Sequence, residues 1–353
     1  MKAWMLHGIN DIRLENVETP IPMTGEVLLS VKACGICGSD IPRIYATGAH
    51  RMPLIPGHEF SGEVIQIGSG VDPSWIGKRV GVFPLIPCQT CPSCQQTKYE
   101  LCSHYDYLGS RRDGAFSEFV TVPIWNLLEL PNSVTYEAAA MLEPMAVAVH
   151  AMRRTPLDTA ETVLIYGAGT VGMLLAMFLL EQTQCKLLVV GNKEFQKNTL
   201  VKMGLPAGCF CDSTTMDVLS WVQTHTNGSG ADVAFECVGK NNTISQILEC
   251  VNREGHICMV GNPHSDIFLE KSVYWNILRK ELTVSGTWNS SFKSADREDW
   301  RYVINKLECG RIHPQYLITH RLPIEHLEEG LHIMRDKTQH YIKIMMTEEI
   351  CSR

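Results

Sequence analysis

Residues 163–172 decide the fold, and they read Val163-Leu164-Ile165-Tyr166-Gly167-Ala168-Gly169-Thr170-Val171-Gly172. The four apolar residues at the start are typical of a strand buried on both faces, and the apolar run from Met173 is typical of a buried helix. Between them lies a G-x-G-x-x-G turn. Such a turn alone is weak evidence, but between a buried strand and an apolar helix it indicates a dinucleotide site.

Each residue of this turn has a separate expected role. Gly167 permits the tight turn, Gly169 lets a pyrophosphate approach the backbone, and Gly172 lets the helix pack closely on the strand. Thr170 and Val171 begin the helix, whose first amides and positive field favour an anion. The alternative is a plain glycine turn that binds nothing.

Short apolar runs alternate with helical segments on the carboxyl-terminal side of the turn. The runs are residues 187–190, 233–235, 257–260 and 281–285. This alternation predicts a parallel, doubly wound sheet. Before about residue 140, glycines and prolines separate short β-type runs such as 27–31 and 63–67, which predicts an irregular, mainly β domain. The expected fold class is therefore α/β, with one mainly β domain and one doubly wound domain.

Length, composition and charge restrict the class of protein. A chain of 353 residues with 45% hydrophobic and 20% charged residues is long enough for two globular domains. Its net charge of −7 gives no reason to expect a nucleic-acid partner. The first ten residues lack a signal-peptide core, and the longest apolar stretch, residues 173–180, is too short to cross a bilayer. We therefore expect a cytoplasmic protein without a membrane partner, whose cysteines are not paired in disulfides.

Four of the 14 cysteines form a C-x2-C-x2-C-x7-C cluster of Cys88, Cys91, Cys94 and Cys102. Four thiolates this close in sequence can surround one tetrahedral zinc ion. Because all four ligands come from the protein, this zinc is expected to be structural. The alternative is two local disulfides or four unrelated thiols.

A second set of potential ligands is spread more widely and contains Cys37, His58 and Glu143. A thiolate, an imidazole and a carboxylate suit a zinc ion that keeps one position open for water or substrate. Each residue by itself is weak evidence, because a lone His or Glu is more often a hydrogen-bonded structural residue.

The order of these elements resembles the zinc-containing medium-chain alcohol and polyol dehydrogenases. That family carries a G-x-C-x-[ST]-D element (here residues 35–40), a G-H-E element (here 57–59) and then the cysteine cluster. The resemblance covers essentially the whole chain. It implies a GroES-like catalytic domain over residues 1–148, a Rossmann dinucleotide-binding domain over 149–288 and a segment, 289–353, that completes the catalytic domain. It also implies chemistry in the cleft between the domains and a homodimer or homotetramer.

The resemblance also assigns the site residues. Cys37 and His58 correspond to ligands of the catalytic zinc. The Glu-Pro pair of the polyol branch places Glu143 at the remaining ligand position. Glu59 is the adjoining carboxylate, which either stays outside the metal or exchanges onto it, and Asp40 would orient the ring of His58.

The implied reaction moves a hydride between a secondary alcohol and NAD(P), with zinc polarising the substrate oxygen. Ser39, two residues after Cys37, is the expected first carrier of the departing proton. Some relatives continue the relay through a His three residues later. Pro42 stands at that position here, so the onward path of the proton is left open.

The end of the next strand distinguishes between the two cofactors. An NAD site expects an acid about 20 residues after the glycines, to bind the ribose 2′-hydroxyl. Here the strand ends in Gly191, Asn192 and Lys193. Gly191 is expected to leave room, and Asn192 and Lys193 can contact a 2′-phosphate. NADP is therefore favoured and NAD remains possible, the alternative being that Lys193 only faces solvent.

Two longer runs indicate the substrate. Within the family, residues 39–50 and 109–114 are most similar to galactitol-1-phosphate 5-dehydrogenase, which implies a sugar alcohol or its phosphate as substrate. Such a substrate needs cationic anchors, and the candidates are Arg43, His50, Arg111 and Arg112. The alternative for each arginine is a structural salt bridge. Relatives of that enzyme use NAD, so Gly191 argues against a simple transfer of its full activity.

Other functions remain as alternatives. Within the family, these are a secondary-alcohol or L-threonine dehydrogenase. Outside it, a zinc-free quinone reductase lacks the metal ligands that this chain carries. A non-catalytic ligand-binding relative is opposed by the retained ligands, Ser39 and the glycine turn, and activity with NAD(P) and a panel of polyols separates it from the enzymes.

Overall fold

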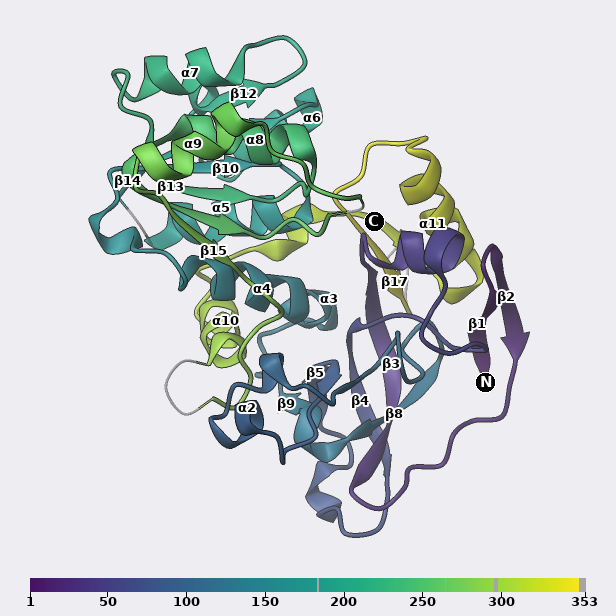
Figure 1. The fold of residues 1–353 in the computed structure, drawn as a ribbon. Coiled ribbons are helices and arrows are strands. Elements are labelled where there is room, and N and C mark those ends of the chain that lie inside the picture. Colours follow the sequence, from purple (N-terminus) through teal and green to yellow (C-terminus); the bar gives the residue numbers. More distant parts are fainter. Residues whose placement is uncertain (183, 264, 295–297, 349–353) are drawn as a thin grey trace. The chain divides into compact units, whose positions relative to one another are not determined.

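The computed structural model describes residues 1–182, 184–263, 265–294 and 298–348. The chain forms two compact units, one of Met1–Glu143 with Ser291–Arg353 and one of Pro144–Ser290 (Figure 1). The boundaries expected from the sequence are residues 148 and 288. Residues 349–353 of the expected C-terminal segment lie outside the described residues.

The unit of Pro144–Ser290 contains a six-stranded sheet with the order β12-β11-β10-β13-β14-β15. All of its neighbouring strands pair in parallel. The strands are β10 (Thr162–Tyr166), β11 (Lys186–Gly191), β12 (Phe210–Asp212), β13 (Ala231–Glu236), β14 (Val251–Met259) and β15 (Thr283–Gly286). The chain runs outward from β10 in one direction and then from β13 in the other, which makes the sheet doubly wound.

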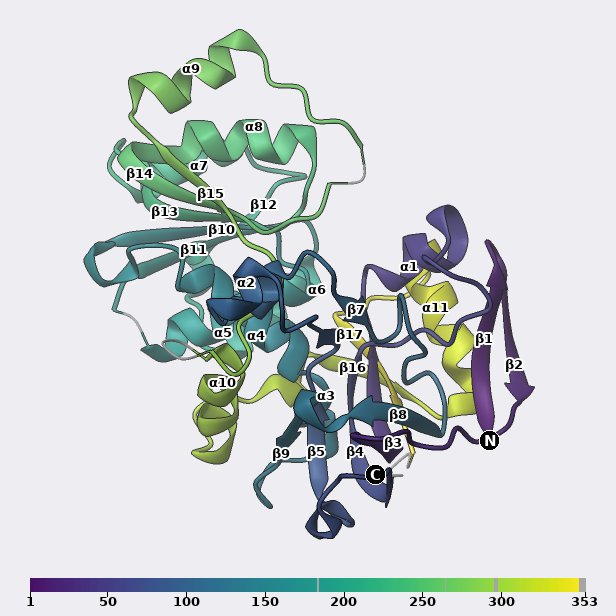
Figure 2. The same ribbon diagram turned by 60° about the horizontal axis from the view of Figure 1, so that its bottom comes forward.

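Helices connect these strands and cover the sheet. They are α5 (Thr170–Gln182), α6 (Glu194–Lys202), α7 (Val218–His225), α8 (Asn241–Cys250) and α9 (Lys271–Arg279). Figures 1 and 2 show α7, α8 and α9 on one face of the sheet and α5 on the other. Every residue of β10 is buried because helices cover both of its faces, which explains its continuous apolar run.

The other unit is built around β3 (Glu26–Ile36), which pairs with three other strands. The main sheet has the order β16-β17-β3-β4-β5-β9, with β8 also paired to β3. Its other strands are β4 (Glu59–Ile67), β5 (Arg79–Val82), β8 (Phe119–Pro123), β9 (Leu127–Glu129), β16 (Ile318–Leu322) and β17 (Lys343–Thr347). Two small sheets pair β1 (Lys2–Gly8) with β2 (Asp11–Asn16), and β6 (Leu85–Ile86) with β7 (Asp106–Tyr107).

The C-terminal segment is part of this unit because it supplies both a strand and a helix to its core. β17 lies antiparallel to β3. Phe292 and Trp300 stack on Phe83, with ring centroids 4.7 and 5.5 Å away. The helices of the unit are α1 (Asp40–Pro42), α2 (Pro92–Gln95), α3 (Tyr136–Ala140), α10 (Asp299–Glu308) and α11 (Leu327–Asp336), while α4 (Leu142–Met152) crosses the boundary between units.

The mainly β unit and the doubly wound unit confirm the predicted fold class. Among the described residues, no helix combines the length and the apolar character that a membrane span requires.

Candidate functional site

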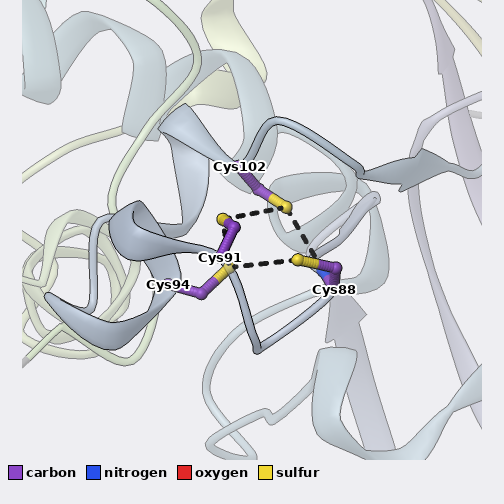
Figure 3. A group of neighbouring side chains, drawn as sticks. All are labelled: Cys88, Cys91, Cys94 and Cys102. Atoms are coloured by element: carbon purple, nitrogen blue, oxygen red, sulfur yellow. Dashed lines mark hydrogen bonds between the residues drawn. The ribbon is translucent and has the colours of Figure 1, made fainter.

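The four clustered cysteines converge on one point (Figure 3). Their sulfur atoms all lie within 4.8 Å of one another, with 3.5 Å between Cys91 and Cys94 and 4.0 Å between Cys88 and Cys94. All four are free thiols, which rules out the local disulfides considered above. Zinc–sulfur bonds of about 2.3 Å in a tetrahedron require sulfur atoms about 3.8 Å apart. The spacing therefore fits one zinc ion.

The ionisation of these thiols also fits a cation. Backbone amides of Cys94 and Ser103 lower the pKa of the Cys91 thiol to about 5. Burial raises the pKa of the Cys94 thiol to about 12. Four thiolates this close to one another repel, so they are all ionised together only when a positive charge lies among them.

The second group contains Cys37, His58 and Glu59, whose ligand atoms lie within 4.8 Å of one another. The strand register explains this proximity. Cys37 directly follows the last residue of β3, Glu59 begins β4, and Gly35 of β3 pairs with Glu59. Cys37 is half-buried, whereas His58 and Glu59 are buried. A thiolate, an imidazole and a carboxylate at this spacing can hold a zinc ion with a position left open.

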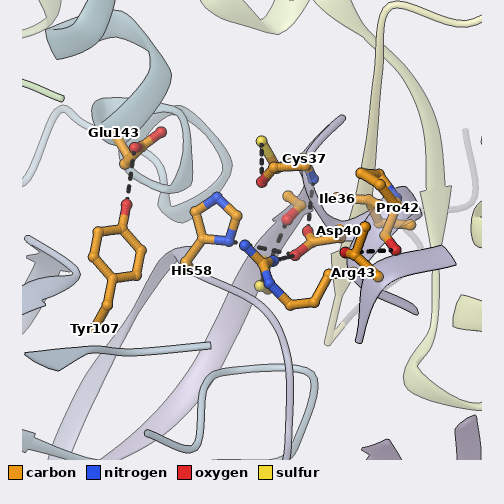
Figure 4. Close-up of polar contacts among 12 residues, drawn as sticks. Ile36, Cys37, Asp40, Pro42, Arg43, His58, Tyr107 and Glu143 are labelled. Carbon is orange, nitrogen blue, oxygen red and sulfur yellow. Dashed lines mark hydrogen bonds and ion pairs between the residues drawn. The ribbon is translucent and has the colours of Figure 1, made fainter. Parts of the chain in front are cut away.

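Asp40 lies behind this group and connects two of its members (Figure 4). Its carboxylate accepts a hydrogen bond of 2.9 Å from the backbone N–H of Cys37, and its other oxygen lies 3.4 Å from Nδ1 of His58. Burial opposes protonation of His58, but Asp40 and Cys37 hold the pKa of His58 well above its usual value. With Nδ1 directed at Asp40, Nε2 is the ring atom available to a metal.

Glu143 lies outside the three-residue group and has a partner of its own. The hydroxyl of Tyr107 donates to Glu143 at 3.4 Å, and the ring of Tyr107 stands edge-on to His58 at 5.8 Å (Figure 4). Burial raises the pKa of Glu143 to about 7, against the attraction of His58. Of the two glutamates, Glu59 and not Glu143 therefore groups with Cys37 and His58 within 4.8 Å.

Glu59 is held by a lysine from the far end of the chain. Nζ of Lys343 lies 2.5 Å from Oε2 of Glu59 and donates to the carbonyl of Ile36 at 3.0 Å. Burial opposes the charge on Lys343, yet Glu59 raises the pKa of the lysine. Both side chains are 2% exposed.

The charges of the site fit a divalent cation. The site contains four acidic groups and two basic side chains besides His58. The acidic groups are Cys37, Asp40, Glu59 and Glu143, and the basic side chains are Arg43 and Lys343. Arg43 pairs with Asp40 at 2.6 Å, and Lys343 pairs with Glu59. If a metal displaced the protons of Cys37, His58 and Glu143, these groups would carry two net negative charges in a mostly buried site, which is the charge that one Zn²⁺ ion would neutralise.

Ser39 lies beside the candidate ligand Cys37, and its hydroxyl contacts the Cys37 sulfur at 3.3 Å. The side chain is half-buried, and Pro42 ends the short helix α1 that follows. The serine is therefore close enough to the group to exchange a proton with a substrate oxygen bound there.

The glycine turn has the shape that a dinucleotide requires. Gly167 has a φ of +112°, and a side chain there would meet Val238 at 2.6 Å. A Cβ on Gly172 would lie 1.9 Å from the carbonyl oxygen of Gly167, so the helix packs directly on the turn. A Cβ on Gly169 would meet nothing within 4 Å. That open side, next to the first turn of α5, can receive a pyrophosphate.

The room expected at Gly191 is filled. A Cβ there would lie 2.6 Å from the ring of Phe210 and 2.7 Å from Oε1 of Gln196. The same Gln196 oxygen accepts a hydrogen bond of 3.0 Å from the backbone N–H of Asn192. Asn192 is exposed and Lys193 is half-buried, with its Nζ 5.7 Å from the Phe195 ring. Gly191 therefore accommodates the protein's own side chains, and the contacts available to a cofactor belong to Asn192, Lys193 and Gln196.

The four candidate substrate anchors lie in different surroundings. Arg43 is 17% exposed and pairs with Asp40, and Arg112 pairs with Glu26, so both form the structural ion pairs weighed above as the alternative. His50 is exposed. Arg111 stacks on the ring of Tyr105 at 4.6 Å, and its buried Nε has no hydrogen-bond partner among the described residues.

Three residues of the site are absent from the sequence-based predictions, namely Tyr107, Lys343 and Gln196. Lys343 is 284 positions from its partner Glu59, and no local motif marks it. Tyr107 follows the cysteine cluster closely, and a buried tyrosine is expected to need a polar partner, but the sequence does not identify Glu143 as that partner. Gln196 lies four residues after Asn192 and could have been noticed from helical spacing.

Two sequence families match most of the chain. Residues 23–132 match the alcohol dehydrogenase GroES-like domain, and residues 170–308 match the zinc-binding dehydrogenase family. Galactitol 1-phosphate 5-dehydrogenase of Escherichia coli K12 is 33% identical over 317 residues, which are 90% of this chain and 91% of that protein. L-threonine 3-dehydrogenase of Bacillus licheniformis is 32% identical over 324 residues, 90% of each chain.

A solved structure matches almost the whole fold. A zinc-binding dehydrogenase from Sinorhizobium meliloti 1021, crystallised with NADP, superimposes with a TM-score of 0.88 at 26% identity and covers 98% of both chains.

Proposed function

The chain belongs to the zinc-containing medium-chain alcohol dehydrogenase family, and from this premise we propose that it transfers a hydride between NAD(P) and a secondary alcohol of a sugar alcohol or its phosphate. Membership makes it an oxidoreductase that acts on a small-molecule alcohol with a nicotinamide cofactor. The substrate, the preference for NADP, the binding of two zinc ions and the role of each residue belong to the proposal.

The observation that supports it most is the cluster of Cys37, His58 and Glu59, whose ligand atoms lie within 4.8 Å of one another and could hold a zinc ion. Zinc, when bound there, supplies the positive charge that makes an alcohol easier to deprotonate. Asp40 fixes the ring of His58, and the hydroxyl of Ser39 is the first group that can accept the departing proton. The cysteine quartet holds a second, structural zinc.

The dinucleotide lies against the glycine turn in this proposal. Gly169 gives its pyrophosphate access to the backbone, and the first amides of α5, from Thr170 and Val171 onward, donate to it. Gly167 and Gly172 keep the strand and helix close enough for those amides to converge, because neither position tolerates a side chain.

Steady-state reduction of NAD and NADP by the zinc-loaded protein tests the function. The substrate panel contains free hexitols, hexitol phosphates, L-threonine and simple secondary alcohols. Turnover that requires a hexitol phosphate supports the polyol-phosphate substrate. Turnover confined to L-threonine or simple alcohols would show that the substrate is one of these and not a polyol phosphate. No turnover with any compound of the panel would favour a non-catalytic ligand-binding protein.

Arg111 is the anchor that the structure favours for a phosphorylated substrate. Its Nε is a buried donor without a partner among the described residues, and such donors are rare unless a ligand or water completes them. Tyr105, on which it stacks, lies 6.3 Å from Tyr107, the partner of Glu143. Arg111 therefore stands two aromatic rings away from the candidate metal ligands.

Replacing Arg111 by methionine is expected to raise KM for a hexitol phosphate by about 10- to 100-fold, because one charge-assisted hydrogen bond contributes roughly 1.5–3 kcal/mol. KM for the unphosphorylated hexitol should change little. Arg13→Met is the matched control, since Arg13 is an exposed arginine that pairs with Asp11. Equal increases in KM for the phosphorylated and the unphosphorylated hexitol would show that Arg111 does not bind the phosphate group.

The preference for NADP rests on Asn192, Lys193 and Gln196, since no acid ends β11. Gly191→Asp would collide with Phe210, so the informative change is at the exposed Asn192. Asn192→Asp is expected to lower the ratio of kcat/KM for NADP over NAD by about 10-fold, because the carboxylate repels the 2′-phosphate and accepts from a 2′-hydroxyl. Asn198→Asp, on the exposed side of α6, controls for added charge. An unchanged ratio in the Asn192 variant would exclude this residue from cofactor selection.

A homodimer or homotetramer is also part of the proposal. β15 is an edge strand of the six-stranded sheet, and Val284 in that strand and Trp275 and Leu278 in α9 are exposed. An uncovered edge strand with apolar neighbours is typical of a surface that pairs with another chain. Sedimentation velocity at assay concentration measures the oligomeric state directly.

A further inference from the structure

The pair of Glu59 and Lys343 is buried as completely as the hydrophobic core, with both side chains 2% exposed. Only one oxygen of Glu59, Oε2, meets Lys343, at 2.5 Å. The ammonium group also donates to the carbonyl of Ile36, the residue before Cys37. Gly35 makes room for the pair, because a Cβ there would lie 2.4 Å from Oε2 of Glu59 and 3.3 Å from the Lys343 side chain.

Stability alone is a poor reason for such a pair. Removing two charges from water costs several kcal/mol for each ion, and apolar residues of similar size often stabilise a protein as well or better. A buried ion pair does, however, restrict the orientation of the carboxylate. Here the restriction falls on Glu59, the carboxylate whose oxygen groups with the Cys37 sulfur and the His58 ring within 4.8 Å among the described residues.

The second carboxylate has a different kind of partner. Glu143 accepts a 3.4 Å hydrogen bond from the neutral phenol of Tyr107, whereas Glu59 faces a cation. A carboxylate already bound to an ammonium group gives less electron density to a metal than a free one. It also has one oxygen fewer to offer. The two acidic residues of the site are therefore not equivalent.

We infer that Lys343 is a positioning residue that occupies one oxygen of Glu59, so that only the other oxygen can bind the metal held by Cys37 and His58. The inference rests on the proposed function, because it needs a metal at that group. Lys343 and the metal compete for the same carboxylate. With a metal bound, the lysine would limit the negative charge that Glu59 gives to it, so the metal would keep more positive charge to polarise a substrate oxygen.

Substitution of cobalt for zinc makes the coordination visible through d–d absorption. In Lys343→Met, which keeps an apolar chain of similar length, Glu59 loses its competitor. The cobalt spectrum is expected to change, zinc to bind about 10-fold more tightly and kcat to fall about 10- to 100-fold with KM nearly constant, which is the usual size of effects from outer-shell partners. Lys343→Arg keeps the charge and is expected to restore the original spectrum.

A second pair of variants covers the case in which Lys343→Met does not fold. In the Glu59→Gln background, Lys343 has no carboxylate to hold, so adding Lys343→Met is expected to leave the cobalt spectrum of Glu59→Gln unchanged. A further spectral change in the double variant would show that Lys343 acts by another route and would overturn the inference.

The possible results distinguish a failure of this inference from a failure of the proposed function on which it rests. A folded Lys343→Met protein with the original cobalt spectrum, zinc affinity and kcat overturns the role of Lys343 alone. A wild-type protein that binds metal only at the cysteine quartet overturns the proposed function and this inference together. A changed spectrum that Lys343→Arg restores supports both.

Discussion

Cys37→Ala is expected to lower kcat by at least about 10³-fold while leaving the fold intact, because it removes one of three candidate ligands of the catalytic metal. Cys37 follows the last residue of β3 and is only half-buried, so its sulfur adds little to the core. Bound zinc should fall from two ions to one per chain. The measurements are steady-state kinetics, zinc content and the circular dichroism of the folded protein.

Cys34→Ala is the matched control for this change. Cys34 is a fully buried cysteine on the same strand, its sulfur contacts the carbonyl of Gly35 at 3.8 Å, and it belongs to neither group of candidate ligands among the described residues. This variant should retain both zinc ions and most of its turnover per folded molecule. If Cys37→Ala lost its fold but kept normal activity per folded molecule, Cys37 would be a structural residue and the site would have to lie elsewhere.

Cys94→Ala is expected to have the largest effect on stability. The loop of residues 88–102 contains only the short helix α2 and one turn of 3₁₀ helix, so in the proposed function a zinc ion bound by the four sulfur atoms would hold it together. Loss of one ligand should release one zinc ion and lower the unfolding temperature by roughly 10 °C, which for a unit of this size corresponds to about 3–5 kcal/mol. Aggregation on heating should accompany the loss.

The lobe is also coupled to its surroundings, which enlarges this effect. Tyr99, within the loop, packs edge-on against Trp125 at 5.0 Å, and Trp125 in turn contacts Phe292 at 5.3 Å. Cys309→Ala provides the control, since Cys309 is exposed and belongs to neither metal group. A Cys94→Ala protein that melted like the wild type with two zinc ions bound would contradict the structural role.

Much of the site was predictable because its signals are local. The quartet lies within a single loop, and its spacing brings four sulfur atoms within 4.8 Å of one another. The glycine turn is equally local, since its three glycines lie within six residues. A side chain would be blocked at Gly167 and Gly172 but not at Gly169. Cys37 and His58 are farther apart in sequence, and it was the order of the motifs that connected them.

Other expectations depend on tertiary contacts that the sequence does not show. The sequence suggested that Gly191 leaves room for a phosphate, but Phe210 from the neighbouring strand and Gln196 from the following helix fill that room. Arg43 and Arg112 looked like substrate anchors, and the structure shows each of them paired with an acidic residue. The sequence does not show which arginines form ion pairs, because a long arginine side chain can pair with any of several acidic residues nearby. The tertiary structure decides which acidic residue lies within reach.

The sequence by itself determined the two units, the metal-binding residue types and the dinucleotide turn, since each depends on hydrophobic periodicity or on neighbours in the chain. Tertiary structure alone decided which carboxylate faces Cys37 and which lysine holds it. The pairing of Ile344 with Ile36 places Lys343 at the end of β3, beside Glu59 at the start of β4. Strand register across 284 residues leaves no local trace, because it is set by the packing of the whole sheet.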